Sequence, residues 1–264
     1  MSIPESNTGS KPEAPATPAR VVVDVTIAAP IDAVWRALRD PARLAQWFGW
    51  DYDKLAEEIA VIFLTAATVE TVPGRRLDLG GDVFELEDLG GRTRVRAVRS
   101  APPASDTWDG VYDDVDEGWR TFVFQLAVWL EAQGGVARDA SPRRTVYLAG
   151  HRAGAEAPSL PGAVAASGLD ALAPGAPYAL TASTGDRLTG TVRFRTEHQL
   201  GVSVDAWGPG LLVFAGRPPS DTSPHGGGFA LITLFGAAAA DREAVAARWE
   251  AAWRAAFDRV SLQT

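Results

Sequence analysis

The order of predicted secondary structure repeats once along this chain, and that repeat constrains the fold more than any other feature of the sequence. Residues 20–133 and 143–262 each begin with a strand, continue through short helices and several strands, and end in a long amphipathic helix. Each half has the length of a small domain. The sequence therefore predicts an α+β fold of two domains, at 20–133 and 143–264, with a linker at 134–142 and a disordered tail at 1–19.

Local signals mark the elements of the first half. Pro30 suits the first position of a helix, and Asp40 followed by Pro41 marks the start of a second one. A long helix is predicted from residue 116 to residue 133, capped by Asp114. Polar residues 100–109 are predicted to form a loop. The predicted strands lie at 21–28, 58–72, 76–79, 82–89 and 92–99.

The second half shows the same order with weaker signals. A short helix is expected within 158–169, and Asp241 is expected to cap a final helix at 242–260. The three glycines at 226–228 precede a strand and lack the lysine of a phosphate-binding loop, so they are interpreted as a turn. The predicted strands lie at 145–149, 178–183, 187–195, 201–206, 211–215 and 229–235.

Composition excludes several classes of function. A net charge of −8 argues against a nucleic-acid partner, because phosphate binding needs clustered Lys and Arg. The absence of cysteine excludes disulfides, thiolate metal sites and a cysteine nucleophile. Residues 1–135 hold 13 basic and 22 acidic side chains, a net of −9, so the acidity belongs to the first half. No signal peptide or membrane-spanning segment is predicted, and the expected location is cytoplasmic.

One segment of the first half resembles a known signature. Residues 29–49 read A-P-I-D-A-V-W-R-A-L-R-D-P-A-R-L-A-Q-W-F-G, which is similar to the START-like, or SRPBCC, superfamily. The resemblance is closest to its bacterial branch related to activators of the heat-shock chaperone ATPase. Further matches are V-P-G-R-R-L at 72–77, G-R-T-R-V at 91–95 and E-G-W-R-T-F at 117–122. The second half resembles the family only in its order of elements and in the run at 229–235 followed by Trp249 and Trp253, like a divergent tandem copy.

The resemblance implies a helix-grip fold in each domain. In that fold an antiparallel sheet wraps around a long C-terminal helix and leaves a cavity between them. Members of the superfamily bind lipids, hormones and polyketide-like molecules, and some are enzymes. Fold alone does not decide between these functions.

The chain carries none of the common catalytic or metal-binding motifs. Glu197 and His198 are interpreted as a locally satisfied histidine and its neighbour rather than a catalytic dyad. An acidic run is interpreted as a solvated loop with favourable charges at a helix start, rather than a cation site; it comprises Asp106, Asp109, Asp113, Asp114, Asp116 and Glu117. No catalytic residue, metal or cofactor is therefore predicted.

Aromatic side chains are the main candidates for ligand contact. The chain holds nine Trp, ten Phe and four Tyr, and aromatics at helical spacing usually pack in a core, although some of these could also line a cavity beneath the sheet. Arg120 and Gln125 either reach a cavity or face solvent. The cavity candidates are Trp47, Phe48, Trp108, Tyr112, Trp119, Phe122, Leu126, Trp207, Phe229, Trp249 and Trp253.

The sequence favours a non-catalytic protein that binds a small hydrophobic or amphipathic molecule between sheet and C-terminal helix. One alternative is an interaction protein of the chaperone-ATPase-activator kind, with a chaperone as partner. Another is an enzyme similar to the di-domain polyketide aromatase/cyclases, which also carry tandem helix-grip domains. The sequence leaves the oligomeric state open.

Overall fold

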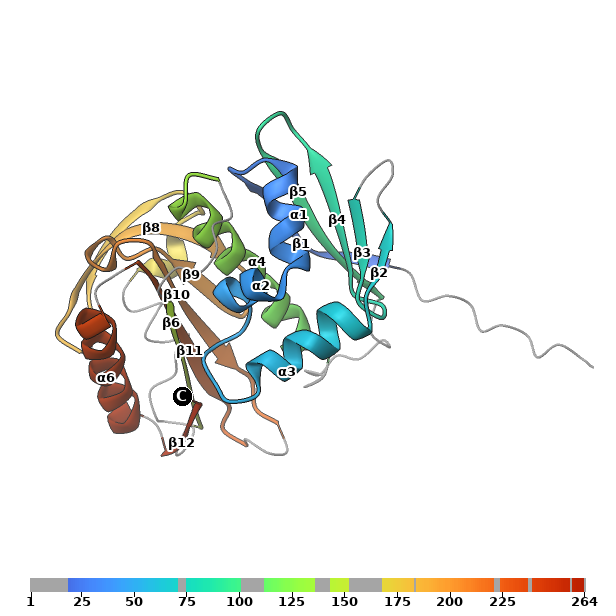
Figure 1. Ribbon diagram of the computed structural model, residues 1–264. Coiled ribbons are helices and arrows are strands. Elements are labelled where there is room, and N and C mark those ends of the chain that lie inside the picture. Colours follow the sequence, from blue (N-terminus) through green and yellow to red (C-terminus); the bar gives the residue numbers. More distant parts are fainter. Residues whose placement is uncertain are drawn as a thin grey trace, which may run out of the picture.

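A computed structural model shows an α+β fold with two antiparallel sheets (Figure 1). Within the described part of the chain, no helix is long and apolar enough to cross a membrane. The structure describes residues 19–70, 75–100, 112–135, 143–151, 168–182, 184–220, 224–236, 239–256 and 258–263.

The first sheet has five strands in the order β1-β5-β4-β3-β2. Its first strand in sequence therefore lies beside its last, and the strands between them follow in reverse order. The bounds are β1 Ala19–Ile27, β2 Thr68–Glu70, β3 Arg75–Asp78, β4 Val83–Asp88 and β5 Thr93–Ser100. These agree with four of the five predicted strands, because a β-branched run marks β1, and glycines between short apolar runs mark β3, β4 and β5.

The second sheet has seven strands in the order β12-β6-β11-β10-β9-β8-β7. Apart from the edge strand β12, the pattern is that of the first sheet: β6 lies beside β11 and the rest follow in reverse. The bounds are β6 Arg143–His151, β7 Pro177–Thr181, β8 Arg187–Arg195, β9 Gln199–Val202, β10 Gly210–Arg217, β11 Gly227–Phe235 and β12 Asp258–Gln263.

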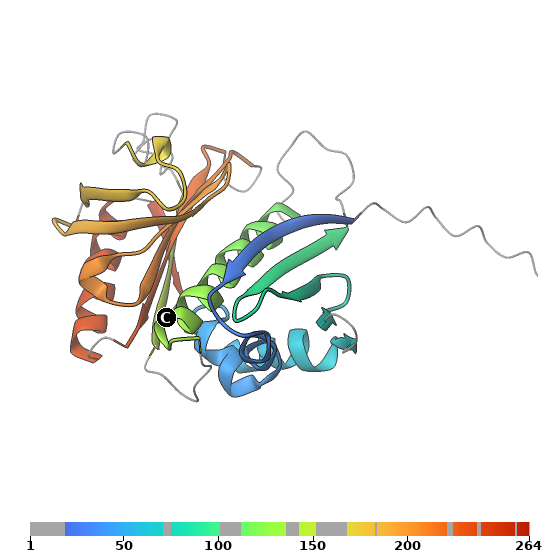
Figure 2. The same ribbon diagram turned by 90° about the horizontal axis from the view of Figure 1, so that it is seen from above.

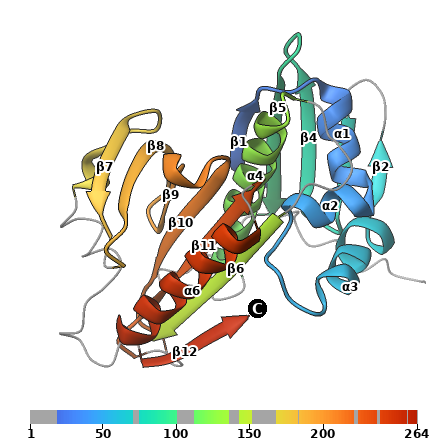
Figure 3. The same cartoon turned by 60° about the vertical axis from the view of Figure 1, so that its left-hand side comes forward.

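Short helices interrupt each sheet in sequence, the first group between β1 and β2, and a long helix follows the strands (Figure 3). Two long ones follow β5 and β11. The first half contains α1 Ile31–Arg39, α2 Pro41–Trp47, α3 Leu55–Ile59, the π-helical turn η1 Ala60–Thr65 and α4 Tyr112–Ala132. The second contains the 3₁₀ turns η2 Leu169–Ala171 and η3 Asp205–Trp207, and α6 Ala239–Ala256.

Helix α4 lies between the two sheets, and the second sheet lies between α4 and α6 (Figure 2). Alternate residues of β10 divide accordingly: Leu211 and Val213 join the core around α4, whereas Leu212 joins the core around α6. Strand β11 divides in the same way, with Leu231 on the first side and Ile232 on the second. Because both faces are covered, the strand is almost wholly apolar, which explains the run F-A-L-I-T-L-F.

Several predicted boundaries are wrong. Within the strand predicted at 58–72, the described residues form the end of α3, then η1 and the short β2, because Ile59 and Phe63, four residues apart, bury one helical face. Helix α4 begins at Tyr112, so Asp114 lies inside it rather than capping it. The last helix ends at Ala256 and β12 follows.

Three other local predictions can be compared with the structure, and several more fall on segments outside the described residues. Pro30 is the N-cap of α1 rather than its first residue. Asp40 caps α2 with Pro41 at its first position, as predicted. Of the three glycines predicted to form a turn, Gly226 ends a turn with φ +74°, whereas Gly227 and Gly228 are the first residues of β11. The expected tail before Ala19, the loop at 101–109, most of the linker and the helix at 158–167 lie outside the described residues.

Asp40→Ala is expected to lower the free energy of unfolding by about 1 kcal/mol, the usual cost of losing an N-cap. The Asp40 carboxylate accepts a hydrogen bond from the Ala42 amide at 3.0 Å, and alanine leaves that amide without it. Urea denaturation followed by circular dichroism measures the loss. Asp40→Asn keeps a capping oxygen, so an equal loss in both variants would contradict the capping role.

Candidate functional site

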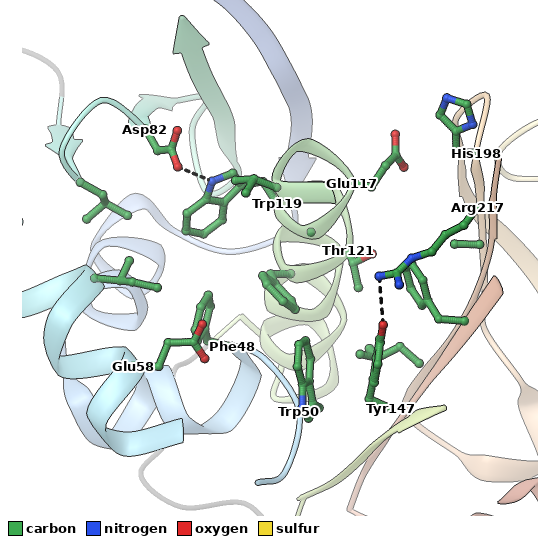
Figure 4. Close-up of a pocket in the computed structure, with 18 of the residues that line it drawn as sticks. Phe48, Trp50, Glu58, Asp82, Glu117, Trp119, Thr121, Tyr147, His198 and Arg217 are labelled. Carbon is green, nitrogen blue, oxygen red and sulfur yellow. Dashed lines mark hydrogen bonds between the residues drawn. The ribbon is translucent and has the colours of Figure 1, made fainter. Parts of the chain in front are cut away.

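A cavity of about 490 Å³ lies between the helices of the first half and the face of the second sheet that packs on α4 (Figure 4). Its wall combines segments that are far apart in sequence. The first half contributes the segment after α2, helices α3 and α4, η1 and the β3–β4 turn. The second half contributes β6, β10, β11 and the turn between β8 and β9. The cavity is therefore shared by both halves of the chain.

The segment after α2, which begins with Phe48 and Gly49 of the W-F-G motif, builds one wall. Gly49 has φ +66°, and a Cβ there would lie 2.9 Å from Leu55 Cδ1, so glycine fits where a side chain would be strained. This turn sends Trp50 towards the second sheet, where it stacks on Tyr147 with ring centroids 4.6 Å apart. The Asp51 amide then donates to Thr145 O at 3.0 Å. Trp50 and Asp51, the two residues that follow the signature, thus connect the two halves beside the cavity.

Ion pairs and hydrogen bonds to Asp51 stabilise this contact between the two halves. The Asp51 carboxylate accepts hydrogen bonds from Arg143 at 3.0 Å, from Arg144 at 3.2 Å and from the Thr145 amide at 2.9 Å. The Arg143 side chain is only 5% exposed and also donates to Phe48 O at 3.0 Å. Burial lowers the pKa of Arg143, and Asp51 opposes that shift.

Aromatic rings form the apolar part of the wall. Phe48 packs on Phe122 with ring centroids 4.8 Å apart, and Phe122 packs on Trp119 at 6.4 Å. On the opposite side, Tyr147 lies against Phe229 at 5.5 Å. A molecule in the cavity would therefore contact flat ring surfaces from both halves.

Two acidic groups lie on the first-half side, each with a hydrogen-bond partner. Glu58 on α3 accepts from the Tyr52 hydroxyl, and burial raises the pKa of Tyr52. Asp82 accepts from Arg99 Nε at 2.5 Å and from Trp119 Nε1 at 2.9 Å. Figure 4 shows both carboxylates on the side of α4 away from the second sheet.

The polar groups on the second-sheet side include a positively charged arginine and an acidic glutamate. Arg217 Nη2 donates to the Tyr147 hydroxyl at 3.2 Å, and its guanidinium lies 5.6 Å from the centre of the Phe229 ring. His198 lines the cavity from the β8–β9 turn. Glu117 on α4 faces that turn and is only 5% exposed. Figure 4 shows Glu117, His198, Arg217 and Tyr147 along this side.

Burial raises the pKa of Glu117 above the ordinary glutamate value of 4.5. Arg120, Thr196 and His198 act in the opposite direction, but burial is the largest contribution. A raised pKa means that the folded protein holds a proton that the unfolded chain has already released.

Stability is therefore expected to fall as pH rises from about 4.5 through the folded pKa of Glu117, because the buried carboxylate must ionise in that window. Glu117→Gln is expected to remove this part of the slope. Urea denaturation between pH 4.5 and pH 8 measures it. Glu197→Gln, at a side chain that is 88% exposed, is the control and keeps the slope; an unchanged slope in Glu117→Gln would contradict the assignment.

The structure distributes the predicted cavity residues over several places. Phe48, Trp119, Phe122 and Phe229 line the cavity. The side chains of Trp108 and Tyr112 lie outside the described residues. The others pack in the two cores: Trp47 and Leu126 around α4, and Trp207, Trp249 and Trp253 around α6.

Trp207 also borders a second, smaller cavity of about 270 Å³ beside α6. Arg120 Nε donates to Val22 O at 3.0 Å. Gln125 is fully buried and donates to Gly49 O at 3.1 Å and to Thr233 Oγ1 at 2.8 Å, so it ties α4 to the second sheet.

Several polar residues in the cavity wall and beside it were misjudged or not selected in the sequence analysis. Asp116 and Glu117 are 2% and 5% exposed, so the interpretation of the acidic run as solvated is wrong for these two. His198 was not selected, and its sequence neighbour Glu197 lies 4.0 Å away and is mostly exposed. Alternation along β10 was the one signal for Arg217, since it shares a face with the apolar residues at 213 and 215.

Among the described residues, no group of three or more His, Asp or Glu side chains could hold a metal ion. The described part of the cavity wall offers aromatic contact, a buried carboxylate, a histidine and an arginine. This combination can bind an apolar molecule and can move a proton on it.

No known protein family and no curated protein matches the sequence. Three crystal structures are similar over most of the chain. DynU16, a putative protein in the dynemicin biosynthetic locus, is 21% identical, covering 89% of this chain and 94% of that one, with a TM-score of 0.28. The di-domain ARO/CYC BexL from the BE-7585A pathway is 14% identical, covering 89% and 91%, with a TM-score of 0.31. The di-domain ARO/CYC StfQ from the steffimycin pathway is 11% identical, covering 86% and 90%, with a TM-score of 0.28.

Likeness at this level assigns neither a family nor a function to this chain.

Proposed function

We propose that this protein binds a small molecule with a flat apolar body and polar groups at its edges, in the cavity between α4 and the second sheet. The observation that supports it most is the cavity of about 490 Å³ walled by aromatic rings from both halves. Binding sites of this kind are mostly apolar with a few polar groups that orient the ligand. The charged edges described above would provide that orientation.

The two halves are proposed to be helix-grip domains at 20–133 and 143–264. In support, both sheets place the first strand beside the last and the remaining strands in reverse, and a long helix follows each sheet. The proposed site differs from the arrangement that the family resemblance implies. It lies between the domains, whereas Trp207, Trp249 and Trp253 pack in the core on the α6 side of the second sheet.

Fluorescence titration with N-phenyl-1-naphthylamine, a neutral aromatic probe, tests binding. We expect saturable enhancement of its emission, and native mass spectrometry of freshly purified protein is expected to show a small molecule that co-purifies. Absence of both would overturn the proposal. A pull-down with the chaperone of the same cell separately tests the interaction that the sequence resemblance predicts.

The second candidate function is enzymatic: reshaping of the bound molecule, as in the aromatase/cyclases named above. The observation that favours it is the convergence of Glu117, His198, Tyr147 and Arg217 along one edge of the cavity. Raised pKa values of buried carboxyl groups in clefts are typical of acid–base sites. An increase in the rate of a proton transfer on a bound molecule distinguishes this candidate from binding alone.

A further inference from the structure

Glu117 occupies an unusual position for a carboxylate. It lies near the start of α4, between the cavity and the turn that joins β8 to β9, with 5% of its surface exposed. One carboxylate oxygen accepts from Arg120 Nη1, three residues along the helix. The other accepts from Thr196 Oγ1 at 3.0 Å.

The β8–β9 turn is bound to α4 around this carboxylate. Thr196 Oγ1 accepts from the amides of His198 at 3.1 Å and Gln199 at 2.8 Å, so the same hydroxyl organises the turn and contacts Glu117. Gln199 Nε2 donates to Glu117 O at 3.0 Å, and Gln199 Oε1 accepts from Thr121 Oγ1 at 2.8 Å. Both the carboxylate and His198 are therefore held in place at the cavity wall by packed elements.

The other carboxylates of the cavity are engaged differently. Asp82 accepts hydrogen bonds from the Arg99 guanidinium and from the Trp119 indole N–H. Glu58 accepts from the Tyr52 hydroxyl. Glu117 faces Arg120 on its own helix and Thr196 and His198 on the turn, yet burial prevails and raises its pKa. Glu117 lines the cavity, is buried and has a raised pKa, which is the increased basicity that a general base requires.

We propose that Glu117 is a general base that removes a proton from the carbon next to the carbonyl group of a ketone held in this cavity. The inference rests on the proposed ligand binding and adds a reaction to it. The substrate class is a flat, largely aromatic ketone with an activated C–H bond.

In the proposed step the C–H bond breaks and an O–H bond forms on the Glu117 carboxyl group. The electron pair of the C–H bond moves into a carbon–carbon double bond, and the carbonyl oxygen becomes an enolate. The positive Arg217 and its partner Tyr147, on the second-sheet side, would favour the negative charge on that oxygen. Return of the proton to carbon restores the ketone, so the step needs no oxidant, reductant or second reactant.

Hydrogen–deuterium exchange into 2-tetralone tests this step directly. The probe is a bicyclic aromatic ketone with activated C–H bonds, and enolisation in D₂O replaces those hydrogens with deuterium. Proton NMR follows the loss of the signal, and saturation-transfer NMR on the same sample reports binding. We expect exchange about 100-fold faster than in buffer, in the range of general acid–base catalysis.

Three variants assign the base. Glu117→Gln is expected to return exchange to the buffer rate, whereas Glu197→Gln, at the exposed neighbour of His198, is expected to keep the wild-type rate. If His198→Gln abolishes exchange and Glu117→Gln does not, the histidine is the base and the proposal is overturned. Binding of 2-tetralone without accelerated exchange overturns the proton transfer alone. Absence of binding overturns the proposed function together with this inference.

A measurement on the wild type covers the case in which Glu117→Gln does not fold. The protein-dependent rate of exchange, with the buffer rate at the same pH subtracted, is expected to rise with pH through the raised pKa of Glu117 and then level off, because only the ionised carboxylate accepts the proton. A protein-dependent rate that does not change between pH 4.5 and pH 8 would overturn the assignment.

Discussion

Asp116→Ala is expected to lower the free energy of unfolding by about 3 kcal/mol, because it removes one partner of a buried ionic network. The Asp116 carboxylate is 4% exposed and accepts from Arg20 Nη2 and, at 2.5 Å, from Arg99 Nη1. Arg99 is 11% exposed and also binds Asp82. Without Asp116, two guanidinium groups lose a buried counter-charge. Urea denaturation followed by tryptophan fluorescence measures the effect.

Asp24→Ala is the matched control. Asp24 also accepts two hydrogen bonds from one arginine, Arg94, at 2.7 and 2.8 Å, but both side chains are about 40% exposed. Solvent screens this pair, so its loss is expected to be several times smaller than that of Asp116. Equal losses in the two variants would contradict the importance of burial. The same experiment in 1 M salt is expected to change the effect of Asp24→Ala more than that of Asp116→Ala.

Ala215→Trp is expected to weaken binding of N-phenyl-1-naphthylamine at least about 100-fold, because the indole would occupy the space that an apolar ligand needs. Ala215 lies on β10, is 3% exposed and lines the cavity opposite α4. Its cross-strand neighbour on β11 is Phe229, another wall residue. An existing cavity can accept a larger side chain with less strain than a filled core, so the fold is expected to persist.

Ala132→Trp is the control for the added indole. Ala132 is exposed at the end of α4 and is not among the residues that line the cavity. This variant is expected to bind the probe as the wild type does. Unchanged affinity in Ala215→Trp, with thermal unfolding showing a folded protein, would place the binding site elsewhere.

Local chemistry made much of the fold predictable. Asp40 and Pro41 predicted the start of α2, since a cap needs only the side chain and the next few amides. Alternating apolar residues predicted β3, β4 and β5 to within two residues. The segment at 58–72 failed because a run of apolar and β-branched residues fits either a strand or a buried helical face.

From the sequence, only those site residues could be predicted that lie on a single helix or in the signature motif. Phe48, Trp119 and Phe122 carried visible signals, because they lie in the W-F-G motif or on the apolar stripe of α4. The sequence signals for Tyr147, His198 and Arg217 were weak. These residues line the cavity only because the second sheet packs on the side of α4 opposite the first sheet. That packing depends on tertiary contacts such as those of Gln125 and Asp51.

The sequence by itself determined the repeated order of elements, the cap of α2, most strands and the aromatic face of α4, since each depends on neighbours within a few residues. Only the tertiary structure decided where the cavity lies and that Glu117 is buried beside it. The physical reason is that burial is a property of two surfaces in contact. A carboxylate at a helix start is ordinarily solvated, and here the turn carrying Thr196 and His198 covers it from more than 75 residues away.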